Sequence, residues 1–145
     1  MGRLLMSSHG ISRVGVVGCG LMGSGIAEVV AKSGVTTLVC ETDAMRVEAG
    51  HERIKKSVDK AFQSRKINQE MVEQIHHNLS FTTDLTQLAD CDLVIEAIVE
   101  DEAAKTEVFR VLDRVVRRPE TILATNTSSI PVMKLGMVTI RPTHV

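Results

Sequence analysis

Short apolar runs alternate along this chain with longer segments in which apolar residues recur at helical spacing. The run Arg13–Gly18 (RVGVVG) is apolar and β-branched on both faces, as is typical of a strand buried within a parallel sheet. Further runs of this kind predict four more strands, at Val35–Glu41, Leu79–Thr82, Asp92–Ala97 and Thr121–Thr125.

The segments between these runs have the pattern of amphipathic helices. In the first of them Ile26, Val29 and Val30 share one face, and Gly34 stands where a helix would end. Asp43 and Asn68 are typical N-cap residues for the next two. The predicted helices are Leu21–Ser33, Asp43 to about Arg65, Asn68 to about His77, Asp101–Arg117, and a short one that starts at Ser128 or Ser129 with Pro131 in its first turn.

This alternation predicts an α/β fold, a doubly wound parallel sheet with helices on both faces. The length of 145 residues is that of one domain. No repeat, low-complexity tract or interdomain linker interrupts it. We therefore expect a loose N-terminal extension over residues 1–10 and one domain over residues 11–145.

A glycine-rich segment joins the first predicted strand to the first predicted helix and matches the pattern G-x-G-x-x-G. In this context Gly18 permits a tight turn, Gly20 lets the backbone approach a pyrophosphate, and Gly23 lets the helix pack closely on the sheet. The alternative is a plain strand–turn–helix with spare glycines. The pattern favours a Rossmann domain whose cofactor-binding loop is Gly18, Cys19, Gly20, Leu21, Met22 and Gly23.

An acidic residue at the end of the second predicted strand specifies the kind of dinucleotide. Glu41 lies close to the usual offset of the carboxylate that binds the ribose hydroxyls. A carboxylate there repels a 2′-phosphate, and Thr42 follows it with no arginine directly adjacent. The sequence therefore predicts NAD rather than NADP as the cofactor.

Charge and cysteine content exclude several other classes of function. The formal net charge is −1 and the chain has no Trp or Tyr, which argues against a nucleic-acid partner, and no apolar run is long enough for a membrane span. Cys19, Cys40 and Cys91 are far apart, so we expect neither a metal site nor disulfides, and a cytoplasmic location. Cys19 is expected to be a buried filler; the alternative is a reactive thiolate at a helix N-terminus.

Three further segments carry a resemblance to a known family. With the glycine-rich segment Val14–Val29, they make the chain from Ile11 onward similar to the N-terminal domain of the 3-hydroxyacyl-CoA dehydrogenases, in particular the bacterial 3-hydroxybutyryl-CoA type. The three segments are IEAIVEDEAAK (Ile95–Lys105), TNTSSIPV (Thr125–Val132) and the closing RPTHV. The first two of these are more specific than the glycine loop.

The resemblance implies NAD-dependent oxidation of an (S)-3-hydroxyacyl-CoA to the 3-ketoacyl-CoA, or the reverse, in fatty-acid β-oxidation or butanoate metabolism. It implies an acyl-CoA substrate and a homodimer at full length. Two alternatives remain open at this point. One is a related NAD oxidoreductase of a free hydroxy acid, of the gulonate type, and the other is a stand-alone, non-catalytic NAD-binding module.

Residue roles follow from the resemblance as well. Glu100 and Lys105 match a pair that contacts the cofactor, Asn126 matches an asparagine beside it, and Ser128 matches the residue that binds the substrate's 3-oxygen. Without the resemblance, Glu100 and Lys105 would be interpreted as a solvated charge pair, and the serine segment as a helix N-cap.

Contacts with the CoA moiety are implied for the long second helix. Ser57 aligns with a serine that touches CoA in the family. The companion lysine does not align, because Ser64 stands in its place. Arg65 or Lys66 alongside could serve the CoA phosphates instead, and we take Arg65 as the candidate.

The general base of the family lies outside this chain. It is a histidine in a G-x-H-F-F-N-P segment, oriented by a glutamate further along, and the alignment places it shortly after Val145. His144 precedes that motif and does not match the base. The resemblance also implies last strands and a helical C-terminal domain beyond this chain. We therefore expect the 145-residue chain to bind NAD without catalysing turnover.

Overall fold

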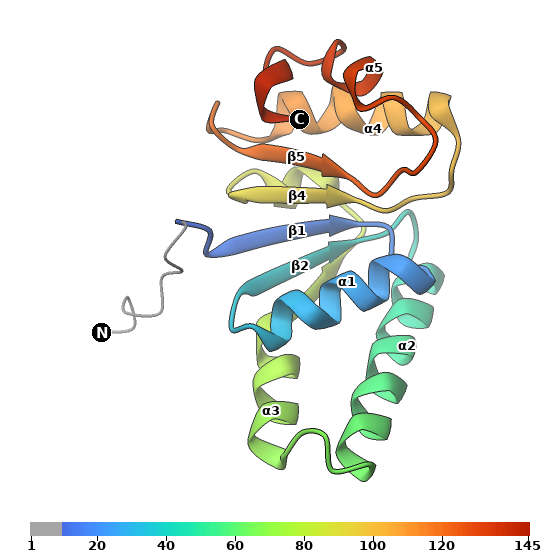
Figure 1. The fold of residues 1–145 in the computed structure, drawn as a ribbon, viewed down its shortest axis with the longest axis vertical. Helices are drawn as coiled ribbons and strands as arrows, with labels where there is room; N and C mark the ends of the chain where they lie inside the picture. Colours follow the sequence, from blue (N-terminus) through green and yellow to red (C-terminus); the bar gives the residue numbers. More distant parts are fainter. Residues whose placement is uncertain (1–9) are drawn as a thin grey trace.

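The computed structural model describes residues 10–145, so most of the expected extension over residues 1–10 lies outside the described part. Its centre is a five-stranded, fully parallel sheet of order β3-β2-β1-β4-β5 (Figure 1). The strands are β1 (Arg13–Val17), β2 (Thr36–Cys40), β3 (Leu79–Thr82), β4 (Leu93–Glu96) and β5 (Ile122–Thr125). The doubly wound α/β prediction is confirmed, and all five predicted strands are present.

The helices agree with the predicted segments except at the last one. Asp43, Asn68 and Asp101 cap their helices through a side-chain oxygen, and Gly34 takes a positive φ of 93° just beyond the first helix. The helices are α1 (Leu21–Lys32), α2 (Ala44–Gln63), α3 (Gln69–Asn78), α4 (Glu102–Val115) and α5 (Val132–Gly136), with short 3₁₀ helices at Leu85–Leu88 and Pro142–His144.

The prediction for the start of the last helix was wrong. It begins at Val132, with Pro131 in extended conformation as its N-cap, rather than at Ser128 or Ser129. Proline disfavours helical conformation in the residue before it, so a helix cannot easily run through Ile130. The Ser129 hydroxyl is also engaged elsewhere, because it donates a hydrogen bond to Glu100.

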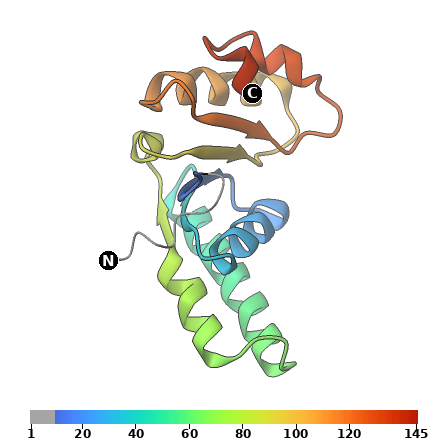
Figure 2. The same cartoon turned by 60° about the vertical axis from the view of Figure 1, so that its left-hand side comes forward.

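Apolar cores lie on both faces of the sheet. On one face α1, α2 and α3 cover strand residues such as Val16 and Val39, with Ile54 of α2 in the same core. On the other face α4 and α5 pack around Phe109 and Leu123. Figure 2 shows the sheet between these two groups of helices, with α2 and α3 projecting as a pair beyond it. Both faces are apolar because a parallel sheet is covered on both sides, as the strand pattern predicted.

The strand order reverses at β1, and this reversal creates the crevice of the domain. From β1 the chain proceeds to β2 and β3 on one side, and later returns to β4 and β5 on the other. The connections that leave β1 and β4 therefore diverge at the carboxyl edge of the sheet. In open α/β sheets this is where ligands bind.

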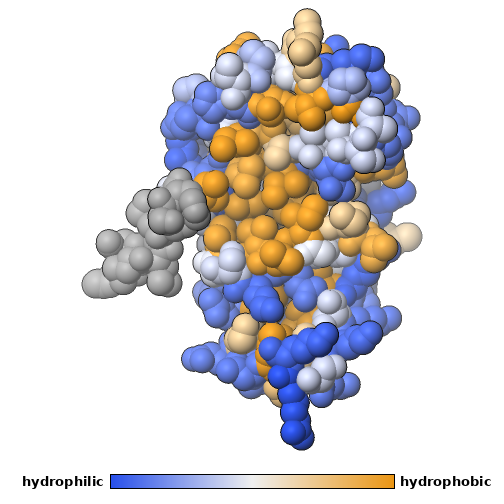
Figure 3. All heavy atoms as spheres, in the orientation of Figure 1, coloured by the Kyte–Doolittle hydropathy of each residue, from blue (hydrophilic) through white to orange (hydrophobic). Residues whose placement is uncertain are grey.

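One part of the sheet keeps apolar side chains half exposed. Leu93 and Ile95 of β4 are in register with Ile122 and Ala124 of β5, and Ile122 is 40% exposed. Figure 3 shows a broad apolar area in the middle of the face seen in Figure 1, between hydrophilic ends. The cover of the sheet is thus less complete on this side.

The last residues are held by a buried ion pair. Nε of Arg141 lies 2.8 Å from Oδ1 of Asp113 on α4, and its Nη1 donates to the carbonyl oxygen of Arg118 at 2.7 Å. The side chains of Arg141 and Asp113 are only 6% and 10% exposed. These contacts fix the segment after α5 against α4.

Candidate dinucleotide-binding cleft

The glycine loop has the geometry of a phosphate cradle. Gly18 has a φ of 96°, and a Cβ there would lie 2.7 Å from the carbonyl oxygen of Ala97. A Cβ on Gly23 would lie 1.9 Å from the carbonyl oxygen of Gly18, so any side chain would push α1 off the loop. A Cβ on Gly20 would meet nothing within 4 Å, because it points into open space. Gly18 and Gly23 are thus needed for packing, whereas Gly20 leaves room for a ligand.

The N-terminus of α1 opens onto the same space. Its N-cap is Gly20, which has no side chain to cap the helix, and the first turn contains no acidic residue. The amide groups of a first helical turn lack intrahelical acceptors and carry a partial positive charge. This end of α1 therefore fits an anion such as a pyrophosphate.

Glu41 lines the cleft and also holds the loop in place. One carboxylate oxygen accepts the amide of Cys19 at 2.7 Å, and the other accepts the amide of Thr42 at 3.1 Å. Arg53 of α2 donates to the carbonyl oxygen of Cys19 at 3.0 Å. The peptide groups on both sides of Cys19 are thus fixed from outside the loop, which pre-organises it for a ligand.

The thiol of Cys19 points away from the cleft. The residue is 1% exposed, and burial raises the pKa of the thiol to about 11, with the Glu41 charge adding to the shift. A Cβ on Gly50 of α2 would lie 2.5 Å from its Sγ atom. Burial therefore argues against the reactive-thiolate alternative and favours the expected buried filler, since desolvation disfavours the charged thiolate. Cys19 reaches a ligand only through its backbone.

A buried ion pair lies where β4 ends. Nζ of Lys105 is 2.6 Å from Oε2 of Glu96 and 3.3 Å from Oε1 of Glu100. The side chains of Lys105 and Glu96 are 1% and 0% exposed, and that of Glu100 is 42% exposed. The interpretation of Glu100 and Lys105 as a solvated pair is therefore wrong for Lys105. Sequence reasoning missed Glu96, although an acidic residue inside the apolar run DLVIEA was a signal.

Glu100 connects this pair to the loop after β5. Its carboxylate accepts hydrogen bonds from the hydroxyls of Ser129 and Thr127, and these bonds lower the pKa of Glu100 to about 2. Glu96 accepts the hydroxyl of Thr125 at 2.6 Å and the amide of Ile98 at 2.7 Å. Two carboxylates and one lysine thus tie together β4, β5, α4 and the serine-rich loop.

These elements enclose one cleft of about 1100 Å³ at the carboxyl edge of the sheet. Most of the predicted cofactor and substrate residues line it, whereas Cys19 and Gly23 lie behind its surface. The predicted residues in its lining are Gly18, Gly20, Leu21, Met22, Glu41, Glu100, Lys105, Asn126 and Ser128.

Arg46 lines this cleft as well and was not predicted. Its Nη1 atom lies 3.4 Å from the hydroxyl of Thr42 and 2.6 Å from Oδ2 of Asp43. The sequence has no arginine directly adjacent to Glu41, but the first turn of α2 brings Arg46 to the same end of the cleft. Its pairing with Asp43 partly neutralises its charge there.

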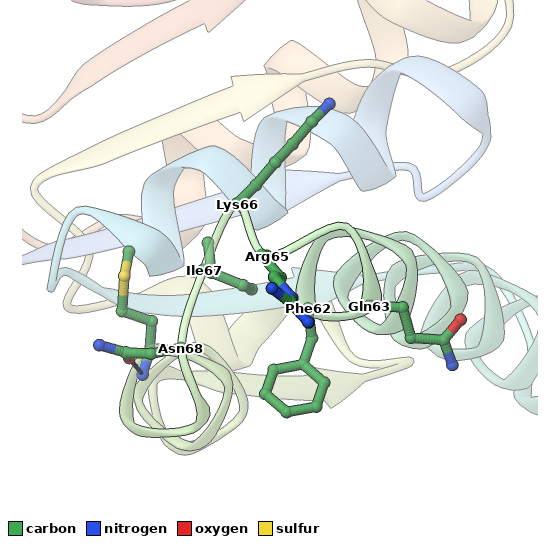
Figure 4. Close-up of a pocket in the computed structure, with 7 residues that line it drawn as sticks. Phe62, Gln63, Arg65, Lys66, Ile67 and Asn68 are labelled. Carbon is green, nitrogen blue, oxygen red and sulfur yellow. Dashed lines mark hydrogen bonds between the residues drawn. The ribbon is translucent and has the colours of Figure 1, made fainter.

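The two residues predicted to contact CoA lie outside the cleft. Ser57 is exposed on α2, and Arg65 has a positive φ of 61° in the turn between α2 and α3. Arg65 lines a separate hollow of about 630 Å³ together with Phe62, Ile67 and neighbouring residues. Figure 4 shows this hollow, with Lys66 extending away from the other side chains. The structure therefore does not bring Ser57 and Arg65 together with the cleft.

Among residues 10–145 no group of three or more His, Cys, Asp or Glu side chains is arranged to hold a metal ion. Nor does this described part contain a helix that is long and apolar enough to cross a membrane.

Comparison with known proteins agrees with the geometry of the cleft. A family model described as "3-hydroxyacyl-CoA dehydrogenase, NAD binding domain" matches residues 13–145. The chain belongs to this family. Its cofactor is accordingly NAD, as the glycine loop and Glu41 predicted.

Relatives of this NAD-binding domain are longer proteins. A 3-hydroxybutyryl-CoA dehydrogenase of Mycobacterium tuberculosis is 51% identical over 138 residues, which cover 95% of this chain and 48% of that protein. The crystal structure of M. tuberculosis FadB2 superposes with a TM-score of 0.92 at 51% identity, covering 93% of this chain and 47% of the other. The (S)-3-hydroxybutyryl-CoA dehydrogenase PaaH1 of Ralstonia eutropha superposes with a TM-score of 0.89 at 30% identity, covering 92% of this chain and 47% of the other. The chain spans about half the length of the curated relatives it matches.

Proposed function

We propose that this chain is the NAD-binding half of an NAD-dependent (S)-3-hydroxyacyl-CoA dehydrogenase that acts on a short acyl chain such as 3-hydroxybutyryl-CoA. One observation carries the proposal. The glycine loop, Glu41, the Lys105–Glu100 pair and Ser128 line one continuous cleft, although they come from four separate parts of the chain. The names of the longer relatives support the substrate class.

Each part of the cleft has a proposed role. The first turn of α1 and Gly20 bind the pyrophosphate, which the open space beside Gly20 accommodates. Glu41 accepts the adenosine ribose hydroxyls and excludes a 2′-phosphate. Lys105 and Glu100 lie at the opposite end, where the nicotinamide half of the dinucleotide would extend. The cofactor supplies hydride transfer when bound.

Ser128 and Asn126 are the proposed substrate side of the cleft. Both are exposed at the cleft's edge, just after β5, and the backbone N–H of Asn126 donates to the carbonyl oxygen of Glu96 at 2.9 Å. A serine hydroxyl in this position can donate a hydrogen bond to the substrate's 3-oxygen as that atom gains negative charge. Contacts of Ser57 and Arg65 with CoA stay a prediction from the resemblance, and both residues lie outside this cleft.

The cofactor part of the proposal is tested with Gly20→Val. The Cβ of a valine at this position would meet no protein atom within 4 Å and would lie in the proposed phosphate site, so the variant is expected to fold and to lose NAD binding. Gly25→Val is the matched control, because Gly25 lies on the same helix, has equally open surroundings and does not line the cleft. Calorimetric titration with NAD⁺ and NADP⁺ measures both. Unchanged NAD⁺ affinity in Gly20→Val, or tighter binding of NADP⁺ by the wild-type chain, would contradict the assignment.

The substrate part is tested in a fusion of this chain to the remaining half of the M. tuberculosis relative, whose matching half superposes closely. We expect NAD⁺ reduction with (S)-3-hydroxybutyryl-CoA and none with free 3-hydroxybutyrate. Ser128→Ala in the fusion should lower kcat/KM for the thioester while leaving NAD⁺ affinity unchanged. Oxidation of the free acid with equal efficiency would refute the substrate class.

A further inference from the structure

Four charged residues line the cleft, and they divide into two groups. Glu41 and Arg46 lie at the end of β2, whereas Glu100 and Lys105 lie beyond the end of β4. Glu96 lies behind Lys105 and carries a further negative charge. Each end of the cleft therefore has its own set of charges.

At the β4 end the lysine charge is already neutralised. Nζ of Lys105 is 2.6 Å from the fully buried carboxylate of Glu96, which is the closer of its two acidic partners. Glu100 lies 3.3 Å from the same nitrogen and is partly exposed toward the cleft. Two carboxylates and one ammonium leave a net charge of −1, and Glu100 is the only one of the three that is substantially exposed.

Glu100 keeps this charge across the working pH range. Hydrogen bonds from Ser129 and Thr127 hold its pKa near 2, far below neutrality. The same bonds orient the carboxylate, because the two hydroxyls come from the loop after β5 and the ammonium comes from α4. A fixed negative charge thus faces this end of the cleft.

The two redox forms of NAD differ at one place only. The nicotinamide ring is cationic in NAD⁺ and neutral in NADH, while the pyrophosphate and adenosine are the same in both. With the pyrophosphate at α1 and the adenosine at Glu41, the nicotinamide half extends toward β4 and β5. The net negative charge of Glu96, Glu100 and Lys105 is therefore on the side of the cleft where NAD⁺ and NADH differ.

We propose that Glu100 sets the relative affinity of this domain for NAD⁺ and NADH, by opposing the cationic ring with a carboxylate that Lys105 does not neutralise. The proposal rests on the proposed placement of the cofactor. It assigns to Glu100 a function beyond general contact: the residue stabilises the oxidised form selectively, and so biases the bound redox couple. Glu41, at the other end, affects both forms equally.

The experiment measures dissociation constants for NAD⁺ and NADH separately, by calorimetry, with the 145-residue chain. Glu100→Gln keeps an oxygen acceptor for the two hydroxyls but removes the charge. We expect the ratio Kd(NAD⁺)/Kd(NADH) to rise by about three- to tenfold, the size of one charge–charge interaction in a partly hydrated site. Glu100→Asp, which keeps the charge, should retain the wild-type ratio, and high salt should reduce the difference between Glu100→Gln and wild type.

Two controls separate this proposal from the proposed function. Glu107→Gln removes the same kind of charge from the exposed side of α4, outside the cleft, and should change neither affinity. Glu41→Gln should weaken both forms and leave the ratio unchanged. If Glu41→Gln behaves in this way but Glu100→Gln changes both affinities equally, the role of Glu100 is refuted and the cofactor placement stands. If Glu41→Gln and Gly20→Val leave both affinities unchanged, the cofactor placement itself is refuted.

Discussion

Replacing Lys105 by methionine removes the only cation that contacts Glu96 in the described part of the chain. Glu96 is fully buried at the end of β4, and its other partners are the amide of Ile98 and the hydroxyl of Thr125. These two donors cannot neutralise the charge. Methionine has nearly the length and shape of the lysine stem, so the packing around residue 105 is largely preserved. The substitution therefore isolates the electrostatic part of the interaction.

The expected loss of stability is large. Breaking a buried ion pair by removing one partner typically costs about 3–5 kcal/mol, because a buried charge is left uncompensated. The distance of 2.6 Å and the exposed fractions of 1% and 0% place this pair in that class. For a domain near 150 residues, each kcal/mol lowers Tm by roughly 2–4 °C, so we expect a decrease of about 10 °C.

Urea unfolding followed by circular dichroism, together with a thermal scan, measures this effect. The double variant Glu96→Gln/Lys105→Met removes both charges and should recover most of the lost free energy, because glutamine can accept the amide of Ile98 with its oxygen and donate to the hydroxyl of Thr125 with its NH2 group. A loss below about 1 kcal/mol for Lys105→Met, the size expected of an exposed pair, would refute the reasoning. Equal instability of the single and double variants would refute it as well.

Three further predictions concern other parts of the molecule. The pKa of Glu100 is lowered from 4.5 to about 2 in the folded state, so its contribution to stability should be complete above pH 4.5 and disappear as the pH falls toward 2. The free energies of unfolding of wild type and Glu100→Gln, measured with urea, should therefore converge over this pH range. A constant difference between them would contradict the prediction. Cys19, with a buried thiol and a pKa of about 11, should react with iodoacetamide at neutral pH only after unfolding, and rapid alkylation of the native chain would contradict this prediction. Arg141→Ala should destabilise the domain by about 3 kcal/mol and free the last residues from α4, since the buried carboxylate of Asp113 would be left without its partner. Hydrogen exchange of α5 checks this loss, and unchanged protection would count against it.

The order of elements and the glycine loop could be predicted because their signals are local. Apolar runs, capping residues and glycines act within a few positions of one another, and except at the start of α5 the structure has them where the pattern placed them. The start of α5 failed for one local and one tertiary reason. Pro131 disfavours helical conformation at Ile130, and the hydroxyl of Ser129 binds Glu100, which lies about thirty residues earlier in the chain.

The ion pair of Glu96 could not be predicted either, because its partner comes from another part of the chain. Its position in an apolar strand was visible in the sequence, but its partner Lys105 is found only when α4 packs back over the end of β4. Arg46 was not predicted to line the cleft, because one helical turn, rather than adjacency along the chain, brings it beside Thr42. The predicted CoA residues lie apart from the cleft, because Ser57 is on α2 and Arg65 is in the turn after it, and neither lines the cleft.

By itself the sequence determined the parallel sheet, the phosphate loop and the preference for NAD. Backbone conformation and the charge of Glu41 depend on residue type and near neighbours, which any reader of the chain can see. Only the tertiary structure decided which charges are neutralised. Lys105 is paired with Glu96 rather than solvated, Glu100 is the exposed member of that group of charges, and the thiol of Cys19 is buried. These outcomes depend on desolvation and on distances between segments far apart in the chain, which folding alone establishes.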